Sequence, residues 1–236
     1  MKRKIVLLIL FIGLAISLRS EVFTLWPWKG GGTSSRESLA ETIPGVGPVL
    51  HTEKMSVNGV DLELTVSAIN TDFVTLTEFL LRTFQPENLQ FGPGSVKTAY
   101  QVGGNLVERW LMVDGGPGKP VTFFRITSPE KLPAPGEWPS ELPELPPGAA
   151  VEQIIRFPGR NAVYGSFRNS GGDPAALLRT VSDRLQLTGW TPLGREAETL
   201  SGGSGEIFLR SDEKKILWVN FGSNGVGAAY IRPYLK

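Results

Sequence analysis

The stretch ERWLMVDGGPGKPVTFFRI (residues 108–126) decides the predicted fold, because a similar stretch, KILWVNFGSNGVGAAYIR (residues 215–232), follows it in the second half of the chain. Each contains an aromatic-rich segment, a glycine-rich turn and a second apolar segment that ends with an Ile next to an Arg. Apolar segments joined by such a turn are typical of a β-hairpin. The sequence therefore predicts the same hairpin twice.

The residues before the first hairpin predict a strand, a helix and a further strand. Residues 60–66 alternate apolar and polar side chains after an Asn58–Gly59 turn, which is typical of a strand with one buried face. Apolar side chains then recur at helical spacing, with Asp72 or Thr71 as the N-cap. The apolar stripe of this helix consists of Phe73, Leu76, Leu80 and Phe84. Strands are expected at residues 96–102, 106–113 and 121–126.

The second half shows the same order of patterns. Residues 162–169 are strand-like, and Asp173 followed by Pro174 is a favoured start for a helix. Gly189 is the expected end of that helix. Its apolar stripe consists of Leu177, Leu178, Val181 and Leu185. Strands follow at residues 206–210, 216–221 and 226–231.

These patterns predict an α+β fold of two tandem βαβββ-type units with antiparallel sheets and one helix each, preceded by an N-terminal signal or anchor segment. The competing interpretation is that an α+β chain of this length shows such an order by chance. The expected organisation is a signal peptide or signal anchor (1–20), a flexible linker (21–48), a first α+β unit (49–126), a Pro-rich linker (127–150) and a second α+β unit (151–236). The Pro-rich linker contains seven prolines, which favour an extended connector over a helix or strand.

The amino terminus predicts export. Lys2, Arg3 and Lys4 precede an uncharged run over residues 5–18, and Ala15–Ile16–Ser17 offers a small-x-small cleavage pattern. As a helix the run is about 21 Å long, short for a hydrocarbon core of about 30 Å. The alternative is an uncleaved anchor extended by residues 22–28, whose tryptophans would lie at the membrane interface. The expected location is periplasmic or extracellular, with membrane association through the N-terminal segment if it is retained.

The composition excludes several classes of chemistry. The chain has no cysteine and a single histidine, His51, so it cannot form disulfides, thiolate metal sites or a centre of several imidazoles. A net charge of +1 gives no electrostatic support for a nucleic-acid partner. We predict no cofactor, no metal site and no catalytic residue, and the sequence does not indicate a small-molecule ligand.

Local motifs do not change this expectation. The glycine-rich turn at residues 114–120 lacks the first glycine and the Ser or Thr of a phosphate-binding loop, and the turn at residues 222–227 has no helix after it. Two S-x-x-K matches, at Ser128 and Ser211, lie in the Pro-rich linker and in a predicted hairpin turn, whereas the acyl-enzyme motif needs a helix start. All four are interpreted as turns or linker.

Three tryptophans form the candidate binding surface. Trp110, Trp190 and Trp218 lie in or beside predicted strands, where they fill the core or form an exposed aromatic platform for a glycan or peptide. The absence of a catalytic constellation favours a non-enzymatic envelope protein that binds a protein partner or assists assembly of a cell-surface or secretion complex. The alternative is a secreted, carboxylate-dependent, glycan-active hydrolase with exposed tryptophans and a cleft carboxyl of raised pKa.

Overall fold

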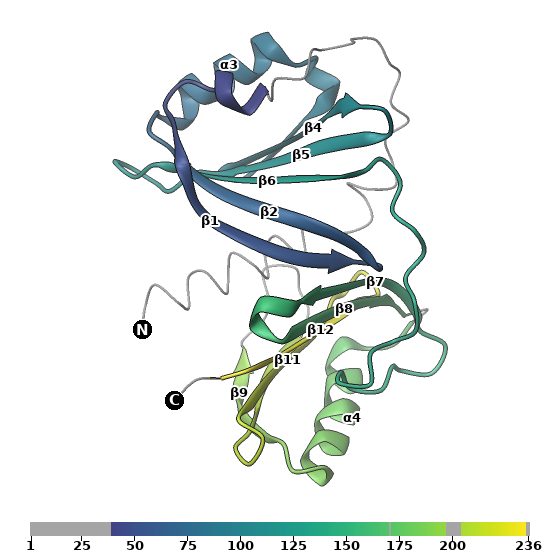
Figure 1. The fold of residues 1–236 in the computed structure, drawn as a ribbon. Helices are drawn as coiled ribbons and strands as arrows, with labels where there is room; N and C mark the ends of the chain where they lie inside the picture. Colours follow the sequence, from purple (N-terminus) through teal and green to yellow (C-terminus); the bar gives the residue numbers. More distant parts are fainter. Residues whose placement is uncertain (1–38, 170, 197–203, 235–236) are drawn as a thin grey trace. The chain divides into compact units, whose positions relative to one another are not determined.

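The computed structural model describes residues 39–169, 171–196 and 204–234, which belong to one compact unit. Its first half is shown in the upper part of Figure 1. A helix, α3, follows two long strands and precedes four further strands. The elements are η1 (Leu39–Thr42), β1 (Val46–Val57), β2 (Val60–Ile69), α3 (Phe73–Thr83), η2 (Pro86–Asn88), β3 (Leu89–Gly92), β4 (Ser95–Gly103), β5 (Leu106–Val113) and β6 (Val121–Pro129).

The second half has the same order of strands and helix. Residues 130–149, which connect the halves, contain no helix or strand. The elements that follow are β7 (Ala150–Phe157), η3 (Pro158–Arg160), β8 (Ala162–Arg168), α4 (Pro174–Leu187), β9 (Thr191–Glu196), β10 (Ser204–Arg210), β11 (Lys215–Phe221) and β12 (Val226–Pro233).

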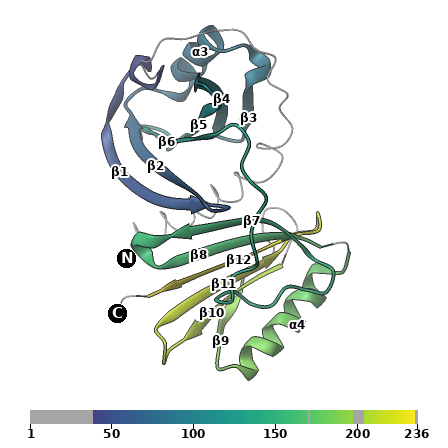
Figure 2. The same ribbon diagram turned by 45° about the vertical axis from the view of Figure 1, so that its right-hand side comes forward.

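All strands belong to one twelve-stranded antiparallel sheet in the order β3-β4-β5-β6-β2-β1-β7-β8-β12-β11-β10-β9. The order within one half mirrors the order within the other, and β1 pairs with β7 where the halves meet (Figure 2). Only β3 and β9 therefore lie at an edge of the sheet.

The predicted fold class, an α+β fold of two tandem βαβββ-type units with antiparallel sheets and one helix each, is therefore wrong. The fold is β-rich: in each half two strands precede the single described α-helix and four follow it. Local patterns missed β1, β3, β7 and β9. Most of the first seven residues of β1 are exposed, and β3 has four residues. β7 lacks strict alternation, and β9 contains Pro192 and Gly194. Local patterns also cannot encode the pairing of β1 with β7, because it joins residues about 100 positions apart in the sequence, such as Val57 and Ile155.

The helices form where the sequence predicts them. Asp72 caps α3 by accepting a hydrogen bond from the Thr75 backbone N–H, and Leu76 and Leu80 are fully buried. Asp173 caps α4 through the N–H groups of Ala175 and Ala176. Asn58 and Gly59 both have positive φ, which confirms the tight turn between β1 and β2.

The core of the second half lies between α4 and one face of the sheet. Leu178, Val181 and Leu185 of α4 pack on Phe208, Leu217 and Val219 of the strands. The connecting segment completes this core, because Leu142 is buried in it and Trp138 packs against it. Gly165 makes this packing feasible: a Cβ there would lie 2.5 Å from the Trp138 ring.

The core of the first half is aromatic. Trp110 makes edge-to-face contacts with Phe84, Tyr100 and Phe123, with ring centroids 5.1 to 5.5 Å apart. The carboxyl group of Glu108 is buried among these rings and accepts hydrogen bonds from the Tyr100 hydroxyl at 2.9 Å and from Trp110 Nε1 at 2.7 Å. Glu108 therefore satisfies the polar atoms of the aromatic core.

Side chains strengthen the junction between the halves. Asn58 Oδ1 accepts from the Ile154 N–H at 2.8 Å, and Asn58 Nδ2 donates to the Pro133 carbonyl at 3.0 Å. Glu53, buried in β1, accepts from Arg160 Nε at 2.8 Å and from Nη2 of the same residue.

No helix among the described residues is long and apolar enough to cross a membrane.

Candidate functional site

A groove in the second half lies between the C-terminal end of α4, residues 140–144 of the connecting segment, and the turn between β10 and β11. We call it the α4 groove. Its volume is about 500 Å³, within the range of roughly 300–1,000 Å³ that is usual for ligand sites. It is lined by Ser140, Glu141, Leu142, Pro143, Glu144, Val181, Arg184, Leu185, Leu187, Thr188, Trp190, Arg210, Glu213, Lys215, Leu217 and Ile231.

The floor of the α4 groove is apolar. Its aliphatic side chains come from the connecting segment, from α4 and from the sheet: Leu142, Val181, Leu185, Leu217 and Ile231. Trp190 adds an aromatic ring, because the chain reverses after α4 at Gly189, where φ is +90°, and the Trp190 N–H then donates to the Leu185 carbonyl at 3.0 Å. The reversal of the chain at the end of α4 therefore positions the Trp190 ring in the floor of the groove.

The rim of the α4 groove is charged but balanced. Arg184, Arg210 and Lys215 provide three positive charges, and Glu141, Glu144 and Glu213 provide three negative charges. A site with this balance has no general preference for a polyanion or a polycation. It suits a ligand with an apolar centre and separate charges of both signs.

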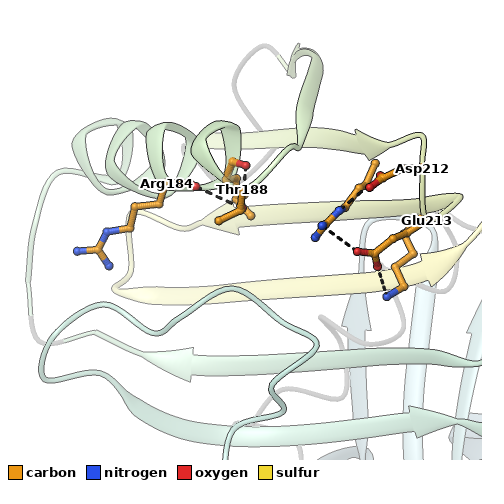
Figure 3. Close-up of polar contacts among 7 residues, drawn as sticks. Arg184, Thr188, Asp212 and Glu213 are labelled. Carbon is orange, nitrogen blue, oxygen red and sulfur yellow. Dashed lines mark hydrogen bonds and ion pairs between the residues drawn. The ribbon is translucent and has the colours of Figure 1, made fainter.

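One side of the rim is a chain of ion pairs on the β10–β11 turn, seen in Figure 3 around Asp212 and Glu213. Glu213 binds Arg210 Nη2 at 2.9 Å and Lys215 Nζ at 2.6 Å. Arg210 Nε is also 3.5 Å from the Asp212 carboxylate. The shared carboxylate holds both cations at the edge of the groove.

The facing side of the rim comes from α4 and the connecting segment. Arg184 Nη1 lies 3.4 Å from the Glu144 carboxylate, and both side chains are more than half exposed. Thr188 closes the helix by donating to the Leu185 carbonyl at 2.9 Å, as Figure 3 shows beside Arg184. Glu141 pairs with Arg156 at 3.0 Å. Exposed pairs of this kind contribute little to stability, so they are free to exchange partners when a ligand binds.

A large apolar side chain lies at the mouth of the groove. Leu187, the last residue of α4, is 88% exposed. The other leucines of the groove, Leu142, Leu185 and Leu217, are at most 7% exposed. An exposed leucine next to an apolar floor extends the surface that a partner could bury.

A second cavity, of about 880 Å³, lies beside the junction and is lined by parts of β1, β2, β6 and η3. Its most buried charge, Glu53, is already bound by Arg160 and lies 3.1 Å from His51 Nε2. Met55 and Leu62 are its main apolar residues. Its central charges pair with each other, as the charges on the rim of the α4 groove do.

The three tryptophans of the candidate binding surface lie in different places. Trp110 is in the aromatic core of the first half, and Trp218 is on the face of the sheet opposite α4. Trp190 lines the α4 groove. All three are at most 8% exposed. They do not form one surface, and a binding role for any of them stays a prediction.

The structure does not bring the other sequence motifs together into a site. Ser211 and Lys214 lie in the exposed β10–β11 turn, where the Lys214 N–H donates to the Ser211 carbonyl. The glycine-rich segments follow β5 and β11 as hairpin turns. Among residues 39–169, 171–196 and 204–234, no group of three or more His, Asp or Glu residues could hold a metal ion.

Sequence reasoning missed the groove because its walls come from separate segments. Leu142 and Glu144 lie in the Pro-rich segment, which composition alone marks as a connector. The alternation of Leu and Glu in SELPELPP (residues 140–147) is the one local signal that this segment packs on a protein surface. In comparisons with family models, curated proteins and solved structures, the chain matches none of them.

Proposed function

We propose that the protein is exported and binds a short, apolar segment of an envelope protein partner in the α4 groove, without catalysing a reaction. Export rests on the basic residues, the apolar run and the small-x-small pattern of the amino terminus. Binding rests on the groove. This combination favours a role in holding a partner or in assembling a cell-surface complex.

The observation that carries the proposal is Leu187 beside an apolar floor. The groove has a volume of about 500 Å³ and an apolar floor, and Leu187 is 88% exposed next to it. A bound segment that covers Leu187 would remove its side chain from water, which contributes about 1.5–3 kcal/mol for a leucine. Binding of a segment that covers Leu187 is therefore favoured by the burial of this side chain.

The charges of the rim indicate which residues flank the apolar centre of the bound segment. A ligand side chain of either sign can find an opposite charge, because Arg184 and Glu144 face each other on one side and Lys215 and Glu213 lie on the other. Such contacts contribute to specificity more than to affinity. We expect a segment with one or two aliphatic residues flanked by an acidic residue and a basic residue.

The structure gives less support to the alternative, a glycan-active hydrolase. That function needs exposed aromatic rings and a carboxylic acid with raised pKa. Trp110 is 2% and Trp218 is 8% exposed. Glu141, on the rim of the groove, has its pKa lowered by a hydrogen bond from its own backbone N–H and by Arg156. A lowered pKa is the opposite of what a general acid requires.

Site-specific photo-cross-linking in intact cells tests the proposal. A photoreactive amino acid replaces Leu187, and in a second strain it replaces Leu81, which is 47% exposed on α3. Both positions are exposed leucines on α-helices, Leu187 at 88% on α4 and Leu81 at 47% on α3, but only Leu187 lines the groove. We expect one dominant adduct at position 187 and none of that mass at position 81.

The results of this experiment distinguish binding in the groove from non-specific cross-linking and from catalysis. Mass spectrometry of the adduct should identify a segment of an exported or membrane protein with aliphatic residues at its centre. Equal adducts at both positions would show that exposure alone causes cross-linking, and would contradict binding in the groove. Turnover of an envelope polymer by the purified protein, abolished by an Asp or Glu substitution, would favour the hydrolase instead.

A further inference from the structure

One side of β1 has no neighbouring strand along most of its length. β1 pairs with β2 from end to end, but its ladder with β7 has two residue pairs among the described residues, Ser56–Arg156 and Val57–Ile155. The same register, if continued, would place Pro158 opposite Lys54. Proline has no N–H to donate to a ladder, and Pro158 instead begins the 3-10 helix η3. The side of β1 before Ser56 is therefore left unpaired.

The unpaired side presents backbone hydrogen-bonding groups. Just after β1, the Asn58 N–H donates to the Ile154 carbonyl at 2.8 Å, on the side of β7. Alternate residues of an antiparallel strand point their N–H and C=O groups to the same side, so Lys54 and Thr52 direct theirs to the unpaired side. Both residues are exposed, and no backbone group in the described part of the chain pairs with them on this side. A further strand would satisfy these groups.

Apolar side chains lie beside these backbone groups. Val49 is 49% and Leu50 is 66% exposed, so both are open to a partner. Leu50 is the extra residue of a β-bulge, because the register passes from Val49–Ser67 to His51–Val66. Exposed backbone groups next to exposed apolar side chains are typical of a strand that pairs with another chain.

The cavity of about 880 Å³ beside the junction adjoins the same side of β1. Residues 51–55 of β1 and residues 158–160 of η3 both line it. Gly159 has no side chain, and even a Cβ there would be 3.9 Å from its nearest neighbour, Glu53 Oε1, so η3 leaves this space open. The volume is within the range of roughly 300–1,000 Å³ that is usual for ligand sites. The end of an extended segment therefore has room between β1 and η3.

We propose that a partner protein adds an extended segment of about six residues to the unpaired side of β1, along residues 49–54 and antiparallel to them, as β2 and β7 are. Six residues of a strand span about 20 Å. The backbone of the segment exchanges hydrogen bonds with Thr52 and Lys54, its apolar side chains cover Val49 and Leu50, and one end enters the cavity. In this mode of recognition the main-chain bonds provide affinity and the side chains provide specificity.

Lys54 indicates the charge of the segment. It is exposed, and no ion pair joins it to another described residue, although Glu63 lies opposite it on β2. An added strand would lie about 5 Å from β1 and about 10 Å from β2. Lys54 is therefore nearer to the segment than Asp61 and Glu63, the carboxylates that β2 contributes to the cavity. We expect an acidic residue opposite Lys54 and aliphatic residues opposite Val49 and Leu50.

A second copy of the chain fits this site less well. The edge strands of its sheet are β3, which has four residues, and β9, which contains Pro192 and an irregular register. Both belong to a wide sheet that η3 would obstruct, whereas a single segment passes beside η3. The site shares no residue with the α4 groove, so its failure would leave the proposed function unaffected.

Photo-cross-linking in intact cells tests the added strand. A photoreactive amino acid replaces Leu50 in the full chain, alone or together with Thr52→Pro, Thr52→Ala or Lys54→Glu. Thr52→Pro removes the N–H on the unpaired side and leaves the bonds to β2 in place, whereas Thr52→Ala keeps that N–H. In a control strain the photoreactive residue replaces Gln90, which is exposed on the edge strand β3. Circular dichroism of the purified variants shows whether each is folded.

We expect one adduct with a partner protein at position 50 and none of that mass at position 90. Thr52→Pro and Lys54→Glu should each lower its yield about tenfold, and Thr52→Ala should leave it unchanged. Lys54→Glu keeps the backbone as it is, so it tests the site even if the proline variant does not fold.

Three results would overturn the proposal. The first is no adduct at position 50, or equal adducts at positions 50 and 90. The second is an undiminished yield in Lys54→Glu or in a folded Thr52→Pro variant. The third is an adduct with twice the mass of the chain, because that result assigns the site to a second copy.

Discussion

Replacing Arg160 with methionine removes the charged partner of Glu53 at the junction of the halves. The Glu53 side chain is 7% exposed and that of Arg160 is 26% exposed. Loss of one partner from a fully buried pair costs about 3–5 kcal/mol, because the other charge stays buried without compensation. His51 Nε2, 3.1 Å from the carboxylate, keeps a partial partner in place. We therefore expect a loss of about 2–3 kcal/mol in the free energy of unfolding.

Urea denaturation followed by circular dichroism measures this loss. The matched control is Arg156→Met: Arg156 pairs with Glu141, but both side chains are nearly half exposed, so the expected loss is below about 1 kcal/mol. Replacing both Glu53 and Arg160 by methionine should cost less than the sum of the single changes, since neither charge is then left alone. A loss below 1 kcal/mol for Arg160→Met, or additive single changes, would refute a buried and coupled pair.

Three further predictions address the junction, the core and the groove. Asn58→Gly keeps the positive φ of the turn but removes two side-chain hydrogen bonds, so we expect a loss of about 1–3 kcal/mol in urea denaturation, with Asn58→Asp intermediate. Gly165→Ala forces the Trp138 ring aside and should cost about 1–3 kcal/mol; an unchanged melting temperature would disprove that contact. Glu141 has a lowered pKa, so its contribution is complete above the ordinary value of 4.5 and is lost as pH falls through the lowered value. Glu141→Gln should flatten the decline in stability below about pH 5, and an identical pH profile would contradict this reasoning.

Local chemistry was enough to predict the elements that depend on neighbouring residues. The Asn58–Gly59 turn and both helix caps, at Asp72 and Asp173, form as expected because each rests on contacts within a few positions. The hairpin of β11 and β12 likewise follows from alternation around a glycine-rich turn. These features need no knowledge of the rest of the chain.

The continuous sheet could not be predicted in the same way. It depends on β7, whose first half pairs irregularly with β8, and on its contact with β1. The α4 groove also depends on distant residues, since Leu142 reaches it from a segment that contains no helix or strand. Of the three tryptophans, only Trp190 lies at the groove, and its place is set by the reversal of the chain after α4.

The affinity of the cross-linked partner segment for purified protein tests the central claim most directly. The segment is synthesised as a peptide and titrated against the parent protein, the Leu187→Asp variant and, as a control on the other helix, the Leu81→Asp variant. The account predicts at least tenfold weaker binding with Leu187→Asp, since the new charge would be buried beside an apolar floor, and unchanged binding with Leu81→Asp. Equal affinity for all three proteins would place the partner elsewhere and contradict the account.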